Sequence, residues 1–174
     1  MEITTYRLSG QRAERRFVAD FAPEAVRLVR QRKAGPMPAT RIVLTTTGGL
    51  QEMGLESMGK AAGVPRHLWP NAGPLRADHG VLYACTVLAP HGVDILIAVR
   101  EAARLAGLDA VLLHEPVHAL QFGTSTARRD ELRYLHHTFG IQQMTTGDLW
   151  RNGRRRTAEE REAQRIEHRL LSRI

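Results

Sequence analysis

The chain has 174 residues, and its 43% hydrophobic content is enough to bury one core without disulfides. A single cysteine, Cys85, excludes an internal disulfide and a zinc site built from several thiolates, so any metal must be held by His, Glu or Asp. The formal net charge of +7 favours anionic partners such as nucleic acid or acidic proteins.

One domain is expected to span residues 1–174, with residues 1–22 as an N-terminal extension. The N-terminus lacks the apolar stretch of a signal peptide, and no later segment approaches the roughly 20 apolar residues that cross a bilayer. We therefore expect a cytoplasmic protein with no membrane partner.

The first predicted helix covers residues 23–34, because Pro23 suits the first helical position and Gly35 can end the helix. The β-branched run at 40–47 predicts a strand. The stretch from 48 to 80 is rich in Gly and Pro, which predicts a long loop with at most one short helix near its start.

Two apolar runs of strand length, 81–88 and 93–99, are separated by a spacing that suits a hairpin turn. Residues 100–121 are apolar with helical periodicity, and Gly107 and Asp109 mark a break or a new helix start. At least the part from Asp109 onward is expected to be one buried helix.

Two further helices are predicted near the C-terminus. Apolar residues at helical spacing indicate a helix within 126–140, with Gly140 as its stop. Thr157 and Glu160 form a capping-box pattern, so the last helix is expected to begin there, within a basic C-terminal segment at 150–174.

The sequence HEPVH at residues 114–118 carries the strongest functional pattern. Residues four apart on a helix project from one face, so His114 and His118 can grip one metal ion. Glu115 lies beside them, where its carboxylate can act as general base toward a water that zinc has acidified. Pro116 removes a helical hydrogen bond, and a kink across His114 is therefore expected.

These residues resemble the zincin metallopeptidases. HEPVHALQ and the later EREA at 160–163 are similar to the HExxHxxQ and ExEA patterns of small bacterial gluzincin-like domains. The resemblance implies an α+β fold, a minimal zincin-like domain in which a short mixed sheet with an edge hairpin packs on a backing helix, an HExxH helix and C-terminal helices. It also implies one Zn²⁺ ion and hydrolysis of a peptide or protein substrate lying along the edge strand.

A third protein ligand must come from downstream, because catalytic zinc keeps its fourth position open. Glu162 is the first choice, since it shares the inward face of the last helix with Ile166. Glu159 shares much of that face and Glu160 lies further round. Glu131, in the nearer helix, is the runner-up.

Tyr134, His136 and His137 are candidates to donate to the oxyanion of a tetrahedral intermediate, and spacing does not select among them. Cys85 is expected to be a small core residue. Peptide deformylases also combine HExxH with a cysteine ligand, but Cys85 lacks the EGCLS context of that family.

The alternative function is an arginine-rich domain that binds nucleic acid or a protein, with a degenerate, non-catalytic HExxH site. Residues 150–174 support it, because eight arginines face four glutamates there. Two observations argue against this alternative: the chain has few aromatic residues for stacking on bases, and it contains no recognised nucleic-acid-binding motif.

Overall fold

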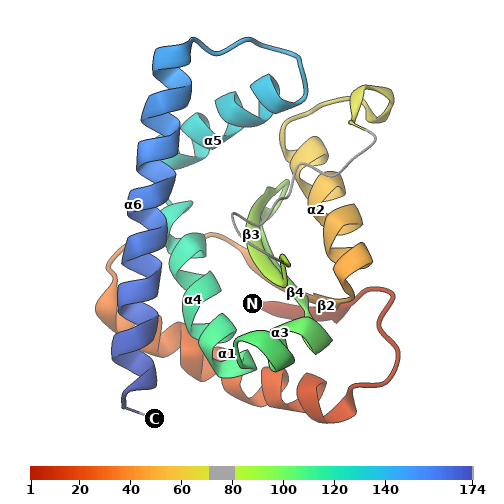
Figure 1. Ribbon diagram of the computed structural model, residues 1–174, viewed down its shortest axis with the longest axis vertical. Helices are drawn as coiled ribbons and strands as arrows, with labels where there is room; N and C mark the ends of the chain where they lie inside the picture. Colours follow the sequence, from red (N-terminus) through yellow and green to blue (C-terminus); the bar gives the residue numbers. More distant parts are fainter. Residues whose placement is uncertain (71–80, 174) are drawn as a thin grey trace.

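The computed structural model describes residues 1–70 and 81–173, and Figure 1 shows their arrangement. These residues form an α+β fold with six α-helices and a four-stranded mixed sheet. Their buried hydrophobic side chains make one cluster that joins the sheet to the helices. The expected α+β class with a small mixed sheet is thereby confirmed. Within the described ranges, no helix combines the length and apolarity needed to cross a membrane.

The strands lie in the order β1 (Glu2–Thr5), β2 (Thr40–Thr45), β4 (Gly92–Ala98) and β3 (Ala84–Ala89). The first three are parallel, and β3 pairs antiparallel with β4, so the predicted hairpin is confirmed. All residues of β4 are buried, as its continuous apolar run requires for a strand covered on both faces. The outer edge of the hairpin is therefore β3.

Residues 1–22 are not an extension. Strand β1 pairs with β2, and helix α1 (Arg12–Arg32) begins well before Pro23. The prediction failed because proline interrupts most helix interiors at a cost of about 3 kcal/mol. Here a continuous buried stripe on α1 offsets that cost by packing against α4; it consists of Val18, Ala22, Ala25 and Val29.

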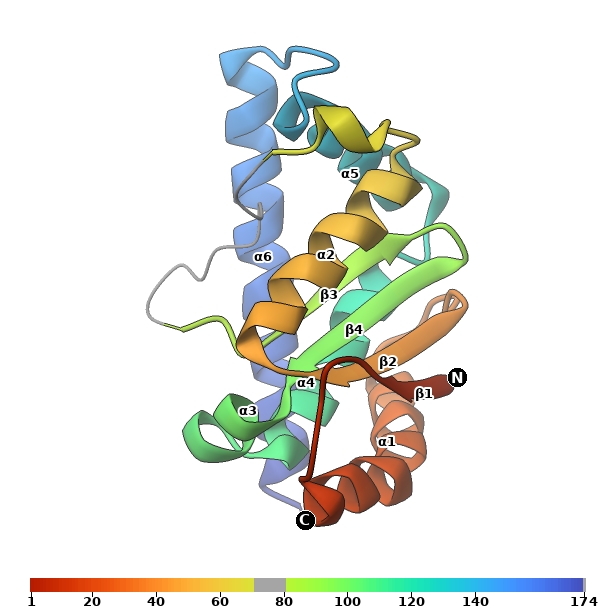
Figure 2. The same cartoon turned by 90° about the vertical axis from the view of Figure 1, so that its right-hand side faces the viewer.

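Helix α2 (Thr47–Ala61) covers one face of the sheet, and α1 and α4 (Leu108–Gln121) lie behind the other (Figure 2). The short helix expected near the start of the predicted loop is confirmed as α2, which is longer than expected. Its glycines allow close packing, because a Cβ at Gly59 would lie 2.4 Å from the Trp69 ring. A short 3₁₀ turn at Arg66–Leu68 follows, and the rest of the predicted loop, residues 71–80, lies outside the described residues.

The break predicted at Gly107 is confirmed. Gly107 has a φ of 88° and separates α3 (Val99–Leu105) from α4, which starts directly after it. Helix α4 then runs through Pro116 without an interruption. Pro116 is buried together with most of its helix, so packing against both neighbouring layers stabilises the turn that lacks one hydrogen bond.

Helix α5 (Ser125–Thr138) is followed by Gly140 with a φ of 74°, as predicted. Helix α6 (Thr146–Leu171) begins earlier than predicted, because Thr145 and Asp148 form the capping box. Thr157 instead lies inside the helix, where its hydroxyl donates to the carbonyl of Gly153. The last helix is therefore long, and it packs along α4.

Candidate metal centre

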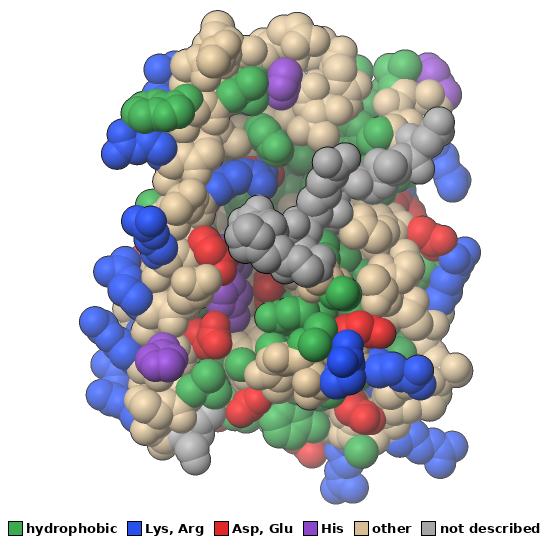
Figure 3. Space-filling view, viewed as in Figure 1, with side chains coloured by type: hydrophobic (Ala, Val, Ile, Leu, Met, Phe, Trp, Pro, Cys, Tyr) green, Lys and Arg blue, Asp and Glu red, His purple; other side chains and the backbone are tan. Residues whose placement is uncertain are grey.

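His114 and His118 lie one turn apart on α4 and project from the same face of the helix toward α6. Their Nε2 atoms are 3.0 Å apart, and their ring centroids are separated by 4.9 Å. The two side chains are largely buried, with exposed fractions of 16% and 20%. Figure 3 shows histidine and acidic side chains gathered beside α6 on this face of the molecule.

Glu160, on α6, is the carboxylate that meets both rings. Its Oε1 lies 3.5 Å from His114 Nε2, and its Oε2 lies 3.2 Å from His118 Nε2. These three side chains are the group of possible metal ligands that the described residues bring together. Their mutual separations resemble those of ligand atoms around tetrahedral zinc, which are about 3.4 Å apart for bonds of roughly 2.1 Å.

The structure does not bring Glu162, the first choice of third ligand, to the two histidines. Its carboxylate accepts hydrogen bonds from Lys33 Nζ at 2.8 and 2.9 Å and from Gln121 Nε2 at 2.9 Å. The reason is how α6 packs on its neighbours. One side of its buried face lies over the histidines of α4, and the other side lies over the C-terminal ends of α4 and α1. Glu160 is on the first side, whereas Glu162 is on the second.

Gln121 orients His118. Its amide nitrogen donates to the carbonyl of Glu159 and to the Glu162 carboxylate, so its amide oxygen must be the atom that faces His118 Nδ1 at 2.7 Å. That oxygen only accepts, which means that Nδ1 carries the proton. The neutral His118 ring therefore presents the lone pair of Nε2 to the centre.

Glu167 orients His114 in the same way. Its Oε2 accepts from His114 Nδ1 at 2.7 Å, so His114 also presents the lone pair of Nε2 when the ring is neutral. Glu167 lies seven residues after Glu160, or about two helical turns, and both carboxylates thus point from one flank of α6. Sequence reasoning missed Glu167 and Gln121 as orienting residues, although the seven-residue spacing was a usable signal.

The centre stabilises positive charge. Burial lowers the pKa of His114, but hydrogen bonds to Glu160 and Glu167 and the charge of Glu115 outweigh it and raise this pKa to about 10. Burial also lowers the pKa of His118, but the hydrogen bonds to Glu160 and Gln121 and the charge of Glu115 together outweigh it, so this pKa is raised. The two rings in turn lower the pKa of Glu160. A bound cation would therefore lie among side chains whose surroundings already favour positive charge on the two imidazoles.

Glu115 projects from α4 toward the sheet edge. Its Oε2 accepts from the Thr86 hydroxyl of β3 at 2.8 Å, and the same hydroxyl lies 3.0 Å from the Glu115 carbonyl oxygen. Glu115 is 6% exposed. Its charge contributes to the raised pKa of both histidines, so it shares their surroundings without belonging to the ligand group.

Tyr83, which directly precedes β3, was not among the predicted site residues. Burial raises the pKa of its phenol, and the charges of Glu167, Glu115 and Glu160 raise it further. Those three carboxylates surround the histidine pair, which places Tyr83 in the same neighbourhood. Cys85 is close by in sequence, and burial raises the pKa of its thiol well above its ordinary value, which disfavours a thiolate ligand.

The other predicted ligands lie elsewhere. Glu131 is buried between α5 and α6, where it accepts from Arg155 Nη2 at 3.2 Å and from Arg156 Nη2 at 2.6 Å. The Glu159 carboxylate lies 3.8 Å from Arg155, and burial raises its pKa. Both residues are thus parts of an ion-pair network that joins the two helices.

The three oxyanion candidates of α5 also point away from the histidine pair. The Tyr134 ring packs under the guanidinium of Arg156, 4.3 Å from its centroid. His136 Nε2 lies 2.9 Å from the Ala62 carbonyl oxygen, and His137 Nδ1 accepts from a backbone amide. Their contacts hold α5 against neighbouring segments.

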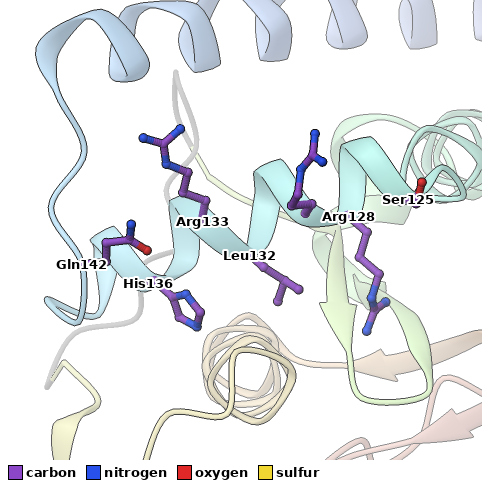
Figure 4. Close-up of a pocket in the computed structure, with 7 residues that line it drawn as sticks. Ser125, Arg128, Leu132, Arg133, His136 and Gln142 are labelled. Atoms are coloured by element: carbon purple, nitrogen blue, oxygen red, sulfur yellow. The ribbon is translucent and has the colours of Figure 1, made fainter.

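A hollow of about 480 Å³ runs along α5, and neither His114 nor His118 lines it (Figure 4). Figure 4 shows that Arg133 points to the opposite side of α5 from Leu132 and His136, so the polar groups do not converge on one point. Arg133 is moreover paired with Asp148 at 2.8 Å.

Comparisons with protein-family models, curated proteins and solved structures found no match for the chain.

Proposed function

We propose that this protein is a zincin-like zinc hydrolase of peptide bonds, which holds one Zn²⁺ through His114, His118 and Glu160. The observation that carries the proposal is the fixed orientation of both rings. Each Nδ1 faces an acceptor, so two Nε2 lone pairs and a carboxylate converge within 3.0 to 3.5 Å. A shared cation relieves the repulsion among these electron-rich atoms.

The ligand types fit zinc. Two imidazole nitrogens and one carboxylate oxygen are a known catalytic set, and three protein ligands leave the fourth position open. When bound, zinc would lower the pKa of a water molecule and polarise a substrate carbonyl. The chain's own contribution is to hold these ligands in position and to handle protons.

Glu115 is the proposed general base. Thr86 holds its Oε2, while Oε1 has no hydrogen-bond partner among the described residues and is available to accept a proton. The low exposure of this side chain limits competition from solvent. The same carboxyl group would then return the proton to the amine that leaves.

The sheet edge supports a peptide as the substrate. Among residues 1–70 and 81–173, strand β3 has a strand neighbour on one side only, and Thr86 ties it to the motif helix. An extended peptide can add to such an edge through main-chain hydrogen bonds. Tyr83, next to this edge, replaces Tyr134 as the proposed proton donor to the developing oxyanion.

The proposal is tested by metal analysis together with peptide hydrolysis. Purified protein dialysed against micromolar zinc should retain one zinc per chain, and His114→Ala and His118→Ala should abolish retention. Cleavage of a mixed peptide library, read by mass spectrometry, should require the zinc. Protein that retains no zinc contradicts the proposal, and stoichiometric zinc without any cleavage supports the non-catalytic alternative.

A further inference from the structure

The outward face of α6 carries a row of arginines, here called the arginine stripe. Ala163, Ile166 and Leu170 are the buried residues of this helix, and the stripe lies on the opposite side. The helical spacing of its members, seven and then four residues, keeps them on one line. The stripe consists of Arg154, Arg161, Arg165 and Arg169, all of which are exposed.

The stripe has no acidic counterpart. Within residues 1–70 and 81–173, no carboxylate lies within salt-bridge distance of these four guanidinium groups, whereas Arg151, Arg155 and Arg156 of the same helix are all paired. The four glutamates of α6 lie on its flanks and point to other partners. Lys and Arg side chains accordingly follow α6 along one edge of Figure 3. No salt bridge among the described residues therefore neutralises the positive charge of the stripe; Arg165 acts on a nearby carboxylate, that of Glu162, only through its charge.

We propose that the arginine stripe binds the phosphate backbone of a nucleic acid. At 1.5 Å per residue the stripe is about 22 Å long, a length over which one strand presents roughly six phosphates. Guanidinium groups bind phosphate oxygens bidentately. Trp150 stands at one end of the stripe, 62% exposed, with Arg154 stacked 4.7 Å from its ring, so its other face is open to a base.

A nucleic acid fits this face better than a membrane does. An interfacial helix needs apolar side chains that enter the lipid, and the residues between the stripe arginines, Thr157, Ala158 and Gln164, offer none of useful size. The inference is independent of the zinc site, because Glu160 and Glu167 leave α6 on a flank rather than on the stripe.

The test compares two variants with equal charge. One replaces the stripe with R154Q, R161Q, R165Q and R169Q; the control replaces four exposed and unpaired arginines of α1 and α3 by R12Q, R15Q, R100Q and R104Q. Binding of a fluorescent single-stranded and a duplex oligonucleotide is measured by anisotropy over a salt series. Circular dichroism confirms that both variants fold.

The stripe variant should bind either oligonucleotide at least about tenfold more weakly, and its salt dependence for duplex should fall by roughly 3 to 4 in log–log slope. The control should keep most of the affinity and the slope. Equal losses in the two variants would show a net-charge effect and overturn the inference. So would absence of oligonucleotide binding by the unaltered protein, including the case in which it binds only phosphatidylserine vesicles.

Discussion

Glu160 and Glu162 stand two residues apart on α6, yet Glu160 meets the histidines of α4 while Glu162 meets Lys33, directly after the end of α1. Two residues correspond to about 200° around a helix, so neighbouring glutamates have unlike surroundings. The pair provides a proposed ligand and a matched control of the same residue type within one turn.

Replacing these two glutamates should separate their roles. Glu160→Gln removes a charged ligand and should weaken zinc binding by about a hundredfold or more. Glu162→Gln acts only through Gln121 and should weaken it less than roughly tenfold. Competition with a chromophoric chelator measures both affinities, and the reverse order would return Glu162 to the ligand set.

Removal of the Gln121 amide tests the orientation of His118. Gln121→Leu leaves His118 Nδ1 without its acceptor, so the ring loses its preferred tautomer, and we expect zinc affinity to fall by about 10- to 100-fold. Gln143→Leu, at an exposed position outside the site, is the control and should leave the affinity unchanged. An unchanged affinity in Gln121→Leu would show that the amide does not position the ring.

The proposed general base should be separable from the metal ligands. Glu115→Gln should keep one zinc per chain and lose peptide hydrolysis by about 10²- to 10⁴-fold, because an amide cannot accept the proton. Thr86→Val should lower kcat to a smaller extent, and Thr86→Ser should restore it, since serine keeps the hydroxyl that contacts Glu115 Oε2. Hydrolysis that survives in Glu115→Gln would exclude Glu115 as the base.

The pKa of His114 predicts how pH affects the zinc-free protein. This pKa is raised to about 10 in the folded state, above its ordinary value, so protonation of His114 stabilises the fold. The contribution is complete below the unfolded pKa and is lost as pH rises toward about 10. Urea midpoints should therefore fall between about pH 7 and pH 10, and His114→Gln should flatten this decline.

Zinc binding requires neutral imidazoles, so zinc must displace the protons that the raised pKa values keep on His114 and His118. Zinc affinity should consequently rise with pH over the interval in which the zinc-free fold weakens, with protons released on binding. Calorimetry in buffers of different ionisation enthalpy measures that release. Zinc binding without proton release at neutral pH would contradict the raised histidine pKa values.

The sequence predicted those features that depend only on neighbouring residues in the chain, such as helical spacing, helix ends and apolar strands. The four-residue spacing of His114 and His118 requires only helical geometry, and the rings do share one face. Gly107 and Gly140 ended helices as their conformational freedom predicts. The apolar run of β4 likewise produced a strand buried on both faces.

Features that depend on packing between distant segments were missed. Which α6 glutamate meets the histidines depends on how α6 lies across α4, and no spacing within α6 contains that information. Strand β1 is only four residues long and exists through its pairing with β2. Pro23 predicts a helix start because the cost of proline inside a helix is local, whereas the compensating burial of Val18 and Val29 is tertiary.

The HEPVH motif in α4 is synthesised before α6, which carries the remaining residues of the candidate metal centre. During synthesis α4 emerges with both imidazoles well before α6 supplies Glu160 and Glu167. A nascent or truncated chain that stops short of Thr146 would carry the HEPVH motif but neither of these carboxylates. The complete candidate metal centre would thus form only once the last helix has been synthesised and packs on α4.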